Sequence, residues 1–311
     1  MLESAKAFVR FAGGLGRFLS ETTTLENGRQ ILGDSLASRE GAMLRVLDRG
    51  VFRNPKSPYR KLLGHLGVEQ GDVERLVRES GVEGALDRLW TEGFRISLEE
   101  FKGRQPIVRP GLSIEARADD FDNPLLTRHY QAETGGSGGA TRRLEVDLDM
   151  LAHEAAYVSV YHSEFGILDR PTALWYGVPP GTAGLKNLLR RARVGRPADR
   201  WFAQTMPTFR GHRLKEALFL QHALLYAKLT GRGLASPEHT PLSDASRVAR
   251  WLSANPTKEP QRNAPDWPRD SQPCWKGPHK RYDIFRAGKE QEKHQKIFSA
   301  AGAARGYRQV P

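Results

Sequence analysis

The chain has 311 residues, of which 39% are hydrophobic and 27% are charged, and it contains a single cysteine, Cys274. This composition excludes a disordered chain and an internal disulfide framework, and the length allows one large domain or two ordinary ones. Because no uninterrupted apolar run is present, we expect neither a signal peptide nor a membrane span, and the cytoplasm is the expected location.

The net charge of +12 is unevenly distributed along the chain. Residues 251–311 contain 12 Lys and Arg against 6 Asp and Glu, an excess of 6 and therefore half of the total. The rest is nearly balanced, apart from one basic run that consists of Lys186, Arg190, Arg191, Arg193, Arg196 and Arg200. We interpret this run as a solvated helix face, with a phosphate or RNA contact as the alternative, because charge alone specifies no partner.

The N-terminal part of the chain predicts a helical region. Leucine and isoleucine at helical spacing predict an amphipathic helix over residues 24–50, broken near Gly33-Asp34. Ser57 and Pro58 predict the start of another helix, as its N-cap and first helical residue. Further helical segments, each ended by a glycine, are expected over residues 58–66, 71–79 and 82–92.

Short elements follow. Ser97 and Glu100 fit a capping box, and residues 107–109 and 112–115 are expected strands around a Pro-Gly turn. Farther along, alternating polar and apolar residues over 143–148 predict a half-buried strand. Helices are then expected over residues 149–161, 183–193, 214–229 and 244–252, of which 214–229 is interpreted as strongly amphipathic.

Eight residues without bulky side chains carry the functional hypothesis: Thr134-Gly135-Gly136-Ser137-Gly138-Gly139-Ala140-Thr141, called the glycine run below. Glycine permits close backbone approach, and successive N–H groups in such a loop can cradle a phosphate. Ala140 and Thr141 stand where a Walker motif needs its Lys, so an ordinary P-loop is excluded. A flexible Gly/Ser linker is the simplest alternative.

Two other functional classes remain open. The glycine run satisfies G-x-S-x-G, the nucleophile elbow of α/β-hydrolases, with Ser137 as the nucleophile of an esterase. That elbow lies between a strand and a helix, whereas a strand is predicted after this run. Loose triad partners exist in the sequence: His212, His222, His239, Asp199, Glu238 and Asp244. The second class is a basic nucleic-acid-binding protein, with the tail aromatics Trp267, Trp275, Tyr282 and Phe285 stacking on bases.

The glycine run also resembles the phosphate loop of the acyl-adenylate-forming superfamily, the AMP-dependent synthetases and ligases, and within it the phenylacetate–CoA ligase-like branch. Residue types match throughout, except that Gly138 stands where a hydroxyl is usual. Residues 53–59 resemble the N-S-P-aromatic segment of that branch, and residues 98–103 resemble the segment leading into its nucleotide domain. The resemblance covers residues 20–253.

The resemblance implies an ATP-dependent carboxylate–CoA ligase. In that reaction a carboxylic acid attacks the α-phosphate of ATP with Mg²⁺ present, and coenzyme A then takes the acyl group from the adenylate. The cofactors implied are ATP and Mg²⁺, with the carboxylic acid and coenzyme A as substrates. The phosphate-binding residues implied are Thr134, Gly135, Gly136, Ser137, Gly138, Gly139 and Thr141. No catalytic residue and no metal ligand is assigned.

The sequence departs from the family beyond residue 253. The family's aromatic-x-x-x-Glu segment, its ribose-binding Asp and its lid Lys are not found at the expected spacing; Tyr282, Phe285, Glu290 and Glu292 do not reproduce it. We therefore expect an incomplete ligase that is weakly active or inactive alone. A second chain that supplies the missing C-terminal half is a candidate partner.

The sequence thus predicts an α/β chain with three parts. Residues 1–115 form a helical region, residues 116–253 a partial nucleotide-binding α/β domain, and residues 254–311 a Pro-rich basic tail, either disordered or the product of a shifted reading frame. His153, His162 and Glu164 lack zinc-site spacing and are interpreted as structural or surface residues. Trp175 and Trp201 are expected to be core aromatics.

Overall fold

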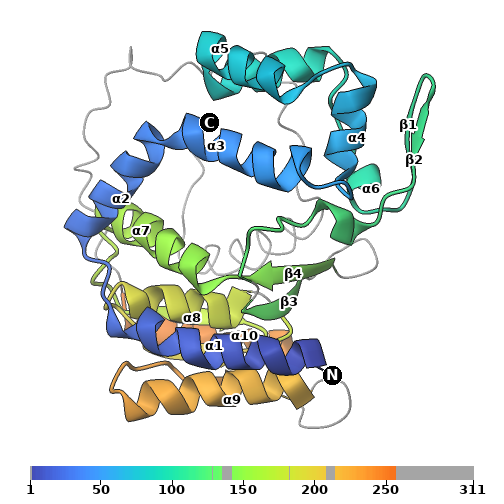
Figure 1. Ribbon diagram of the computed structural model, residues 1–311. Coiled ribbons are helices and arrows are strands. Elements are labelled where there is room, and N and C mark those ends of the chain that lie inside the picture. The colour runs from blue at the N-terminus through green and yellow to red at the C-terminus, as the bar shows by residue number, and fades with distance from the viewer. Residues whose placement is uncertain (1, 128, 135–141, 182, 208–213, 257–311) are drawn as a thin grey trace, which may run out of the picture. The chain divides into compact units, whose positions relative to one another are not determined.

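The computed structural model describes residues 2–127, 129–134, 142–181, 183–207 and 214–256 (Figure 1). Helices dominate, and the sheets are small. The described residues fall into two compact units. The first holds the residues up to Ala132 together with Arg142–Tyr157, and the second holds Glu133, Thr134 and the residues from Val158 onward. The expected domain boundary at residues 115 and 116 falls inside the first unit.

The first unit begins with two helices, of which the first buries one apolar face and the second has a side-chain N-cap. Helix α1 (Leu2–Ser20) buries Phe11, Leu15 and Phe18, whose spacing places them on one face. Helix α2 (Leu25–Ala37) is capped by Thr24, whose hydroxyl oxygen accepts a hydrogen bond from the Asn27 backbone N–H at 3.2 Å.

The break that the sequence predicts near Gly33-Asp34 is wrong. Both residues lie inside α2, and the chain leaves helical geometry at Ser38, which separates α2 from α3 (Arg39–Leu47). A glycine inside a helix costs only about 1 kcal/mol relative to alanine, which neighbouring interactions readily offset. A π-helical turn, η1 (Asp48–Phe52), continues directly from α3.

The later helix boundaries agree with the sequence. Ser57 is the N-cap and Pro58 the first residue of α4 (Pro58–His65). The segments expected over 71–79 and 82–92 are the two halves of α5 (Gln70–Thr91), which is kinked at Gly81 with φ of +69°. A capping box precedes α6 (Leu98–Phe101): the Ser97 hydroxyl accepts from the Glu100 N–H, and the Glu100 carboxylate accepts from the Ser97 N–H.

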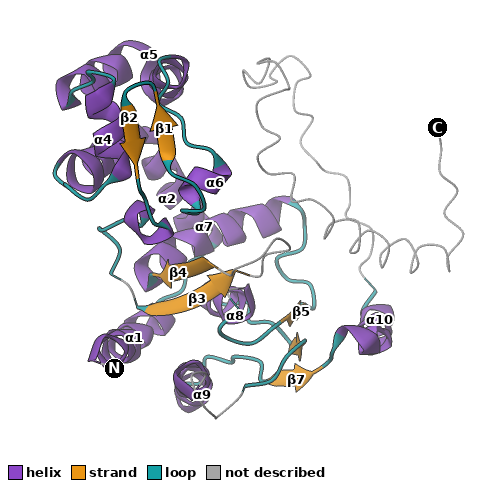
Figure 2. Cartoon of the chain, turned by 90° about the vertical axis from the view of Figure 1, so that its right-hand side faces the viewer, coloured by secondary structure: helices purple, strands orange, loops and turns teal. Residues whose placement is uncertain are grey.

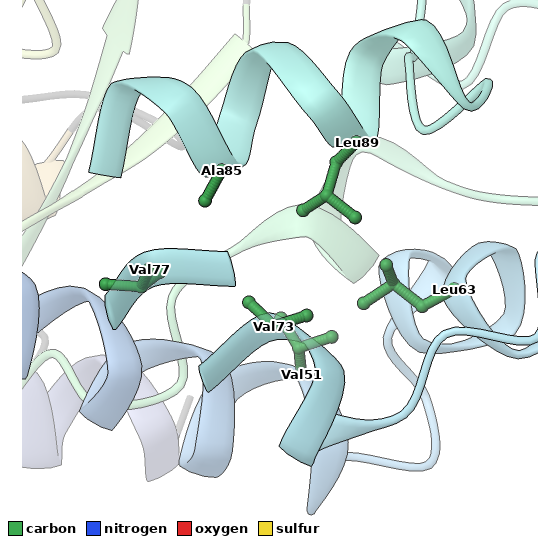
Figure 3. Close-up of a cluster of buried hydrophobic side chains, with 6 residues drawn as sticks. All are labelled: Val51, Leu63, Val73, Val77, Ala85 and Leu89. Carbon is green, nitrogen blue, oxygen red and sulfur yellow. The ribbon is translucent and has the colours of Figure 1, made fainter. Parts of the chain in front are cut away.

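Two apolar clusters hold these helices together. The larger joins η1, α4 and both halves of α5, and its buried members are Val51, Leu63, Val73, Val77, Ala85 and Leu89 (Figure 3). The smaller packs Leu62 of α4 against an antiparallel hairpin of β1 (Ile107–Arg109) and β2 (Leu112–Ile114). The Arg109 guanidinium donates to the Glu100 carboxylate at 2.7 Å, which fixes the hairpin to α6.

A separate two-stranded sheet flanks the glycine run. Strand β3 (Tyr130–Thr134) pairs with β4 (Arg142–Val146), and α7 (Leu148–Glu164) starts almost immediately after β4. The sequence expectation of a strand followed by a helix is confirmed here, with each element starting one residue earlier than predicted.

The second unit contains a three-stranded parallel sheet in the order β5-β6-β7 (Figure 2). Its strands are β5 (Ala173–Tyr176), β6 (Arg200–Ala203) and β7 (Pro237–His239). Parallel strands require crossover connections, and α8 (Ala183–Arg193) and α9 (Leu214–Leu229) supply them. Helix α10 (Ala245–Ala254) follows β7, with Asp244 as its N-cap residue. The sequence predicted these helices but not these strands.

The core of the second unit lies on β6. Trp201, Phe202 and Ala203 are fully buried, and the Trp201 indole N–H donates to the Tyr176 carbonyl oxygen at 3.0 Å. Helix α8 packs closely at Gly184, where an added Cβ would lie 2.5 Å from the Gly177 carbonyl oxygen and 2.5 Å from the Trp201 ring. Only a glycine fits at this point.

Helix α9 is apolar on two faces, so the prediction of a strongly amphipathic helix is wrong. One face is buried through Phe219, Leu220, Ala223 and Ala227. The other exposes four leucines to solvent: Leu214, Leu218, Leu225 and Leu229. A surface helix normally places polar residues there.

Candidate functional site

The glycine run joins the two strands of the β3–β4 sheet. Thr134 is the last residue of β3, and Arg142 is the first residue of β4. The other expected phosphate-binding residues, Gly135, Gly136, Ser137, Gly138, Gly139 and Thr141, lie outside the described residues. The described chain therefore defines the flanks of the candidate site: a strand before the run, a strand after it and then a helix.

Asp147 organises the C-terminal flank. It is 4% exposed and occupies the single position between β4 and α7. Its Oδ1 accepts from the backbone N–H groups of Asp149 at 2.7 Å and Met150 at 3.1 Å, as an N-cap does. Its Oδ2 accepts from the Thr127 N–H at 2.7 Å. One carboxylate thus holds the start of α7 to the chain that leads into β3.

The pKa of Asp147 is lowered from its ordinary value. Burial pushes the pKa upward, but the three backbone N–H donors favour the ionised form, and the nearby His129 adds a smaller effect in the same direction. The lowered pKa means that the carboxylate is charged in the folded chain at neutral pH, which also suits its place at a helix N-terminus.

His129 completes the cap. Its Nδ1 accepts from the Leu148 backbone N–H at 3.1 Å, and its backbone N–H donates to the Val146 carbonyl oxygen at 2.9 Å. Because Nδ1 accepts, the ring proton of the neutral imidazole resides on Nε2. Burial lowers the pKa of His129, and this effect outweighs the neighbouring carboxylates of Asp147 and Asp149, which raise it.

The His129–Asp147 pair is therefore structural. The closest approach of the two side chains is 3.9 Å, from Nδ1 to Oδ1, which exceeds a hydrogen bond. Nδ1 is occupied by the backbone of α7, and Nε2 faces α1, where a Cβ added at Gly14 would lie 3.0 Å away. Sequence analysis missed both residues; an Asp directly before an apolar helical run was the available signal for the cap.

A Ser–His contact lies elsewhere in the first unit. The Ser35 oxygen is 2.7 Å from His153 Nε2, but the Ser35 hydroxyl donates to the Ile31 carbonyl oxygen at 2.6 Å. The imidazole N–H must then donate to the serine oxygen, so His153 cannot take a proton from Ser35 as a general base. This agrees with the interpretation of His153 as a structural or surface residue.

The acids considered as hydrolase partners have other roles. The Glu238 carboxylate pairs with two guanidinium groups, those of Arg200 and Arg247, and the Arg200 hydrogen bond foremost lowers the pKa of Glu238. Asp199 accepts from the Thr172 backbone N–H at 2.6 Å, next to the start of β5. Asp244 caps α10. His212 lies outside the described residues, and His239 is exposed at the end of β7.

The carboxyl ends of the three parallel strands form a second feature of interest, because ligands of α/β sheets bind at such edges. Tyr176 ends β5 and is 42% exposed, and the loop after it leads to the close contact of Gly184 with Gly177. Trp175 donates through its indole N–H to the Thr240 carbonyl oxygen at 3.0 Å. Trp201 is fully buried, which confirms the expectation of a core aromatic, whereas Trp175 is only half-buried.

Among the described residues, no group of three or more His, Cys, Asp or Glu side chains is arranged to hold a metal ion. Within the same residues, no helix is both long and apolar enough to cross a membrane. No protein-family model matches the chain, and no match is found among curated proteins or among solved structures. The functional argument therefore depends on the chain's own residues.

Proposed function

We propose that the glycine run binds the phosphates of ATP, as the phosphate loop of an adenylate-forming ligase does. The observation that supports this most is the order of elements around the run. A strand ends at Thr134, its paired strand begins at Arg142, and a helix begins two residues after that strand ends. The strand and the helix after the run have the order that the resemblance implies for residues 143–161.

The anchoring of the flanks also supports the proposal. A glycine-rich loop loses much conformational freedom when it closes on a ligand, so its ends must be held in place. Strand pairing of β3 with β4 fixes the two ends next to each other, and the Asp147 carboxylate ties the start of α7 to Thr127.

The hydrolase alternative fits the same observations less well. A nucleophile elbow passes from a strand directly into a helix, because that turn exposes the serine oxygen. Here the element after the glycine run is β4, and α7 follows only after that strand. Ser137 is therefore proposed as a phosphate-binding hydroxyl and not as a nucleophile.

We expect this chain to bind ATP but to release little pyrophosphate on its own. Adenylation requires charges that stabilise the transition state on the α-phosphate, and the family's Mg²⁺-binding Glu, ribose-binding Asp and lid Lys are not recognised in this sequence. The carboxylic acid, coenzyme A and a partner chain that supplies these three groups remain part of the proposal.

The first experiment measures ATP binding to the full chain by isothermal titration calorimetry in the presence of Mg²⁺. A double variant, Gly136→Ala with Gly139→Ala, should bind ATP at least about tenfold more weakly. The added Cβ atoms hinder the close approach of phosphate to the backbone N–H groups, and each hydrogen bond to a charged group lost in this way is worth about 1.5–3 kcal/mol. The matched control is Gly33→Ala with Gly64→Ala, two helical glycines where an added Cβ meets nothing within 4 Å.

The possible outcomes distinguish ATP binding by the glycine run from a hydrolase and from a complete ligase. Equal ATP affinity in the loop variant and the control, or no binding to the unmodified chain, would overturn the proposal. Release of an ester-derived alcohol that depends on Ser137 would support the hydrolase instead. Brisk pyrophosphate release from ATP and an aryl or fatty acid would show that the chain is a complete ligase, contrary to our expectation.

A further inference from the structure

The second unit contains a buried guanidinium that no described carboxylate neutralises. Arg191 lies in the last turn of α8 and is 5% exposed. Its one hydrogen bond to a described side chain runs from NH1 to His162 Nδ1 at 3.0 Å, and its Nε is buried without a partner among the described residues. No described Asp or Glu oxygen lies within 4.0 Å of its nitrogens.

This arrangement differs from the solvated helix face that the basic run led us to expect, and for Arg191 that expectation is wrong. Arg196 of the same run follows the expectation: it is exposed and pairs with the Asp169 carboxylate at 2.5 Å. A buried, unpaired charge is costly, and proteins normally retain one only where a partner compensates it. Arg191 is therefore a candidate for binding a partner that the described residues do not supply.

The surroundings indicate the sign and the kind of that partner. His162 accepts from Arg191 and so is neutral, and its pKa is lowered by burial and by the positive charges of Arg191 and Arg190. Burial also lowers the pKa of Arg191, against a raising effect from Asp199. Asp199 accepts from the Thr172 backbone N–H and forms no described ion pair with Arg191. A buried guanidinium that no described carboxylate contacts directly suits an anion.

We propose that Arg191, next to His162, forms a binding site for a phosphate-class oxyanion. A guanidinium presents its N–H groups in a planar fork that matches two oxygens of phosphate, and its hydrogen bonds to such an ion are charge-assisted. Because α8 begins after β5 and ends before β6, this site lies toward the amino ends of the parallel strands. It is separate from the glycine run in sequence and does not depend on ATP binding there.

The experiment follows the thermal unfolding of the full chain while inorganic phosphate is titrated against sodium chloride at matched ionic strength. A ligand that binds only the folded chain raises the unfolding temperature with concentration. We expect a phosphate-dependent rise in the unmodified chain, a phosphate affinity about tenfold to a hundredfold weaker in Arg191→Met, and an intermediate affinity in Arg191→Lys. The charge-matched control Arg196→Met should keep the rise.

Two readouts distinguish this site from a purely structural arginine. Without phosphate, Arg191→Met should be as stable as the unmodified chain or more stable. Methionine removes a buried charge that no described carboxylate contacts, and it fills much of the volume of the arginine side chain. Phosphorus NMR of inorganic phosphate should show line broadening with the unmodified chain that Arg191→Met removes. The inference is overturned if phosphate does not stabilise the unmodified chain, or if Arg191→Met and Arg196→Met respond to phosphate alike.

Discussion

At the scale of single residues, the start of α7 shows how one carboxylate can fix a loop boundary. The first backbone N–H groups of a helix have no partner within the helix, and here His129 and Asp147 accept three of them. Both residues are buried, so water cannot replace either acceptor in full. The flank of the glycine run therefore depends on two side chains that touch no ligand.

Replacing Asp147 tests this dependence. Asp147→Ala should lower the free energy of unfolding by about 2 kcal/mol, the upper end of the range for a lost N-cap, because the Thr127 N–H also loses its acceptor. Urea unfolding followed by far-UV circular dichroism measures the change. Asp149→Ala is the control: its exposed ion pair with Arg17 should contribute within about 0.5 kcal/mol. Equal effects of the two variants would contradict the capping role.

The same cap predicts a pH dependence. The pKa values of His129 and Asp147 are both lowered in the folded chain, so the unfolded chain binds more protons and stability increases with pH. The His129 contribution is complete above its ordinary value of 6.5 and is lost as the pH falls through its folded pKa. The Asp147 contribution is lost only below its ordinary value of 3.8.

His129→Asn isolates the first of these effects, since the Asn side-chain oxygen can accept from the Leu148 N–H in place of Nδ1 and does not titrate. Between about pH 6.5 and pH 5, the free energy of unfolding should decrease less steeply in this variant than in the unmodified chain. Urea unfolding at a series of pH values provides the slopes. Identical slopes would assign the acid sensitivity to other groups, such as His162.

At the scale of elements, the sequence predicts helices well, and it predicts short strands only where a turn marks them, as the Pro-Gly turn does between β1 and β2. Helices of two or more turns repeat their apolar pattern several times, as in Ala183–Arg193, so the period can be recognised. Strands β5, β6 and β7 have only three or four residues each, too few for any period to appear. The apolar run Trp201-Phe202-Ala203 between two expected helices was the strongest signal for a strand–helix–strand unit.

The packing of α8 on the sheet gives a test at this scale. Gly184→Ala would bring a Cβ to 2.5 Å from both the Gly177 carbonyl oxygen and the Trp201 ring, and neither can move aside easily. We expect a loss of about 1–3 kcal/mol in the free energy of unfolding, measured in urea. Gly33→Ala, with open space around the added Cβ, should be neutral or stabilising by up to about 1 kcal/mol. A stable Gly184→Ala chain would show that α8 can shift outward.

At the scale of the whole molecule, the sequence predicts which residues form the candidate site but not how they are arranged in space. Residue types and their order predict a phosphate loop followed by a strand and a helix. The structure describes the flanks of that loop at Thr134 and Arg142, including strand β3 before it, which the sequence did not predict. The buried Arg191 could not be predicted, because its neighbours in the basic run have the same charge and differ only in exposure. Burial of a single residue on a helix depends on tertiary packing, which local patterns do not encode.

The exposed leucines of α9 predict a property of the chain in solution. Leu225 and Leu229 are 58% and 77% exposed, and contiguous apolar surface promotes self-association. Leu225→Glu with Leu229→Glu should change the free energy of unfolding by no more than about 0.5 kcal/mol per site and reduce the average sedimentation coefficient at high concentration. Leu220→Glu, at a fully buried position of the same helix, should unfold the second unit. Comparable loss of stability in both variants would mean that the leucine face is covered in the folded chain.

The burial of Trp201 has a spectroscopic consequence. Its indole is fully enclosed and hydrogen-bonded to the Tyr176 carbonyl oxygen, whereas Trp90, the tryptophan of the first unit, is 40% exposed. Emission from Trp201, isolated by subtracting the spectrum of Trp201→Phe, should therefore lie at short wavelength and shift to long wavelength when the second unit unfolds. Circular dichroism follows the helices of both units. Recorded together, the two signals would distinguish a variant that loosens the α7 cap from one that loosens the parallel sheet.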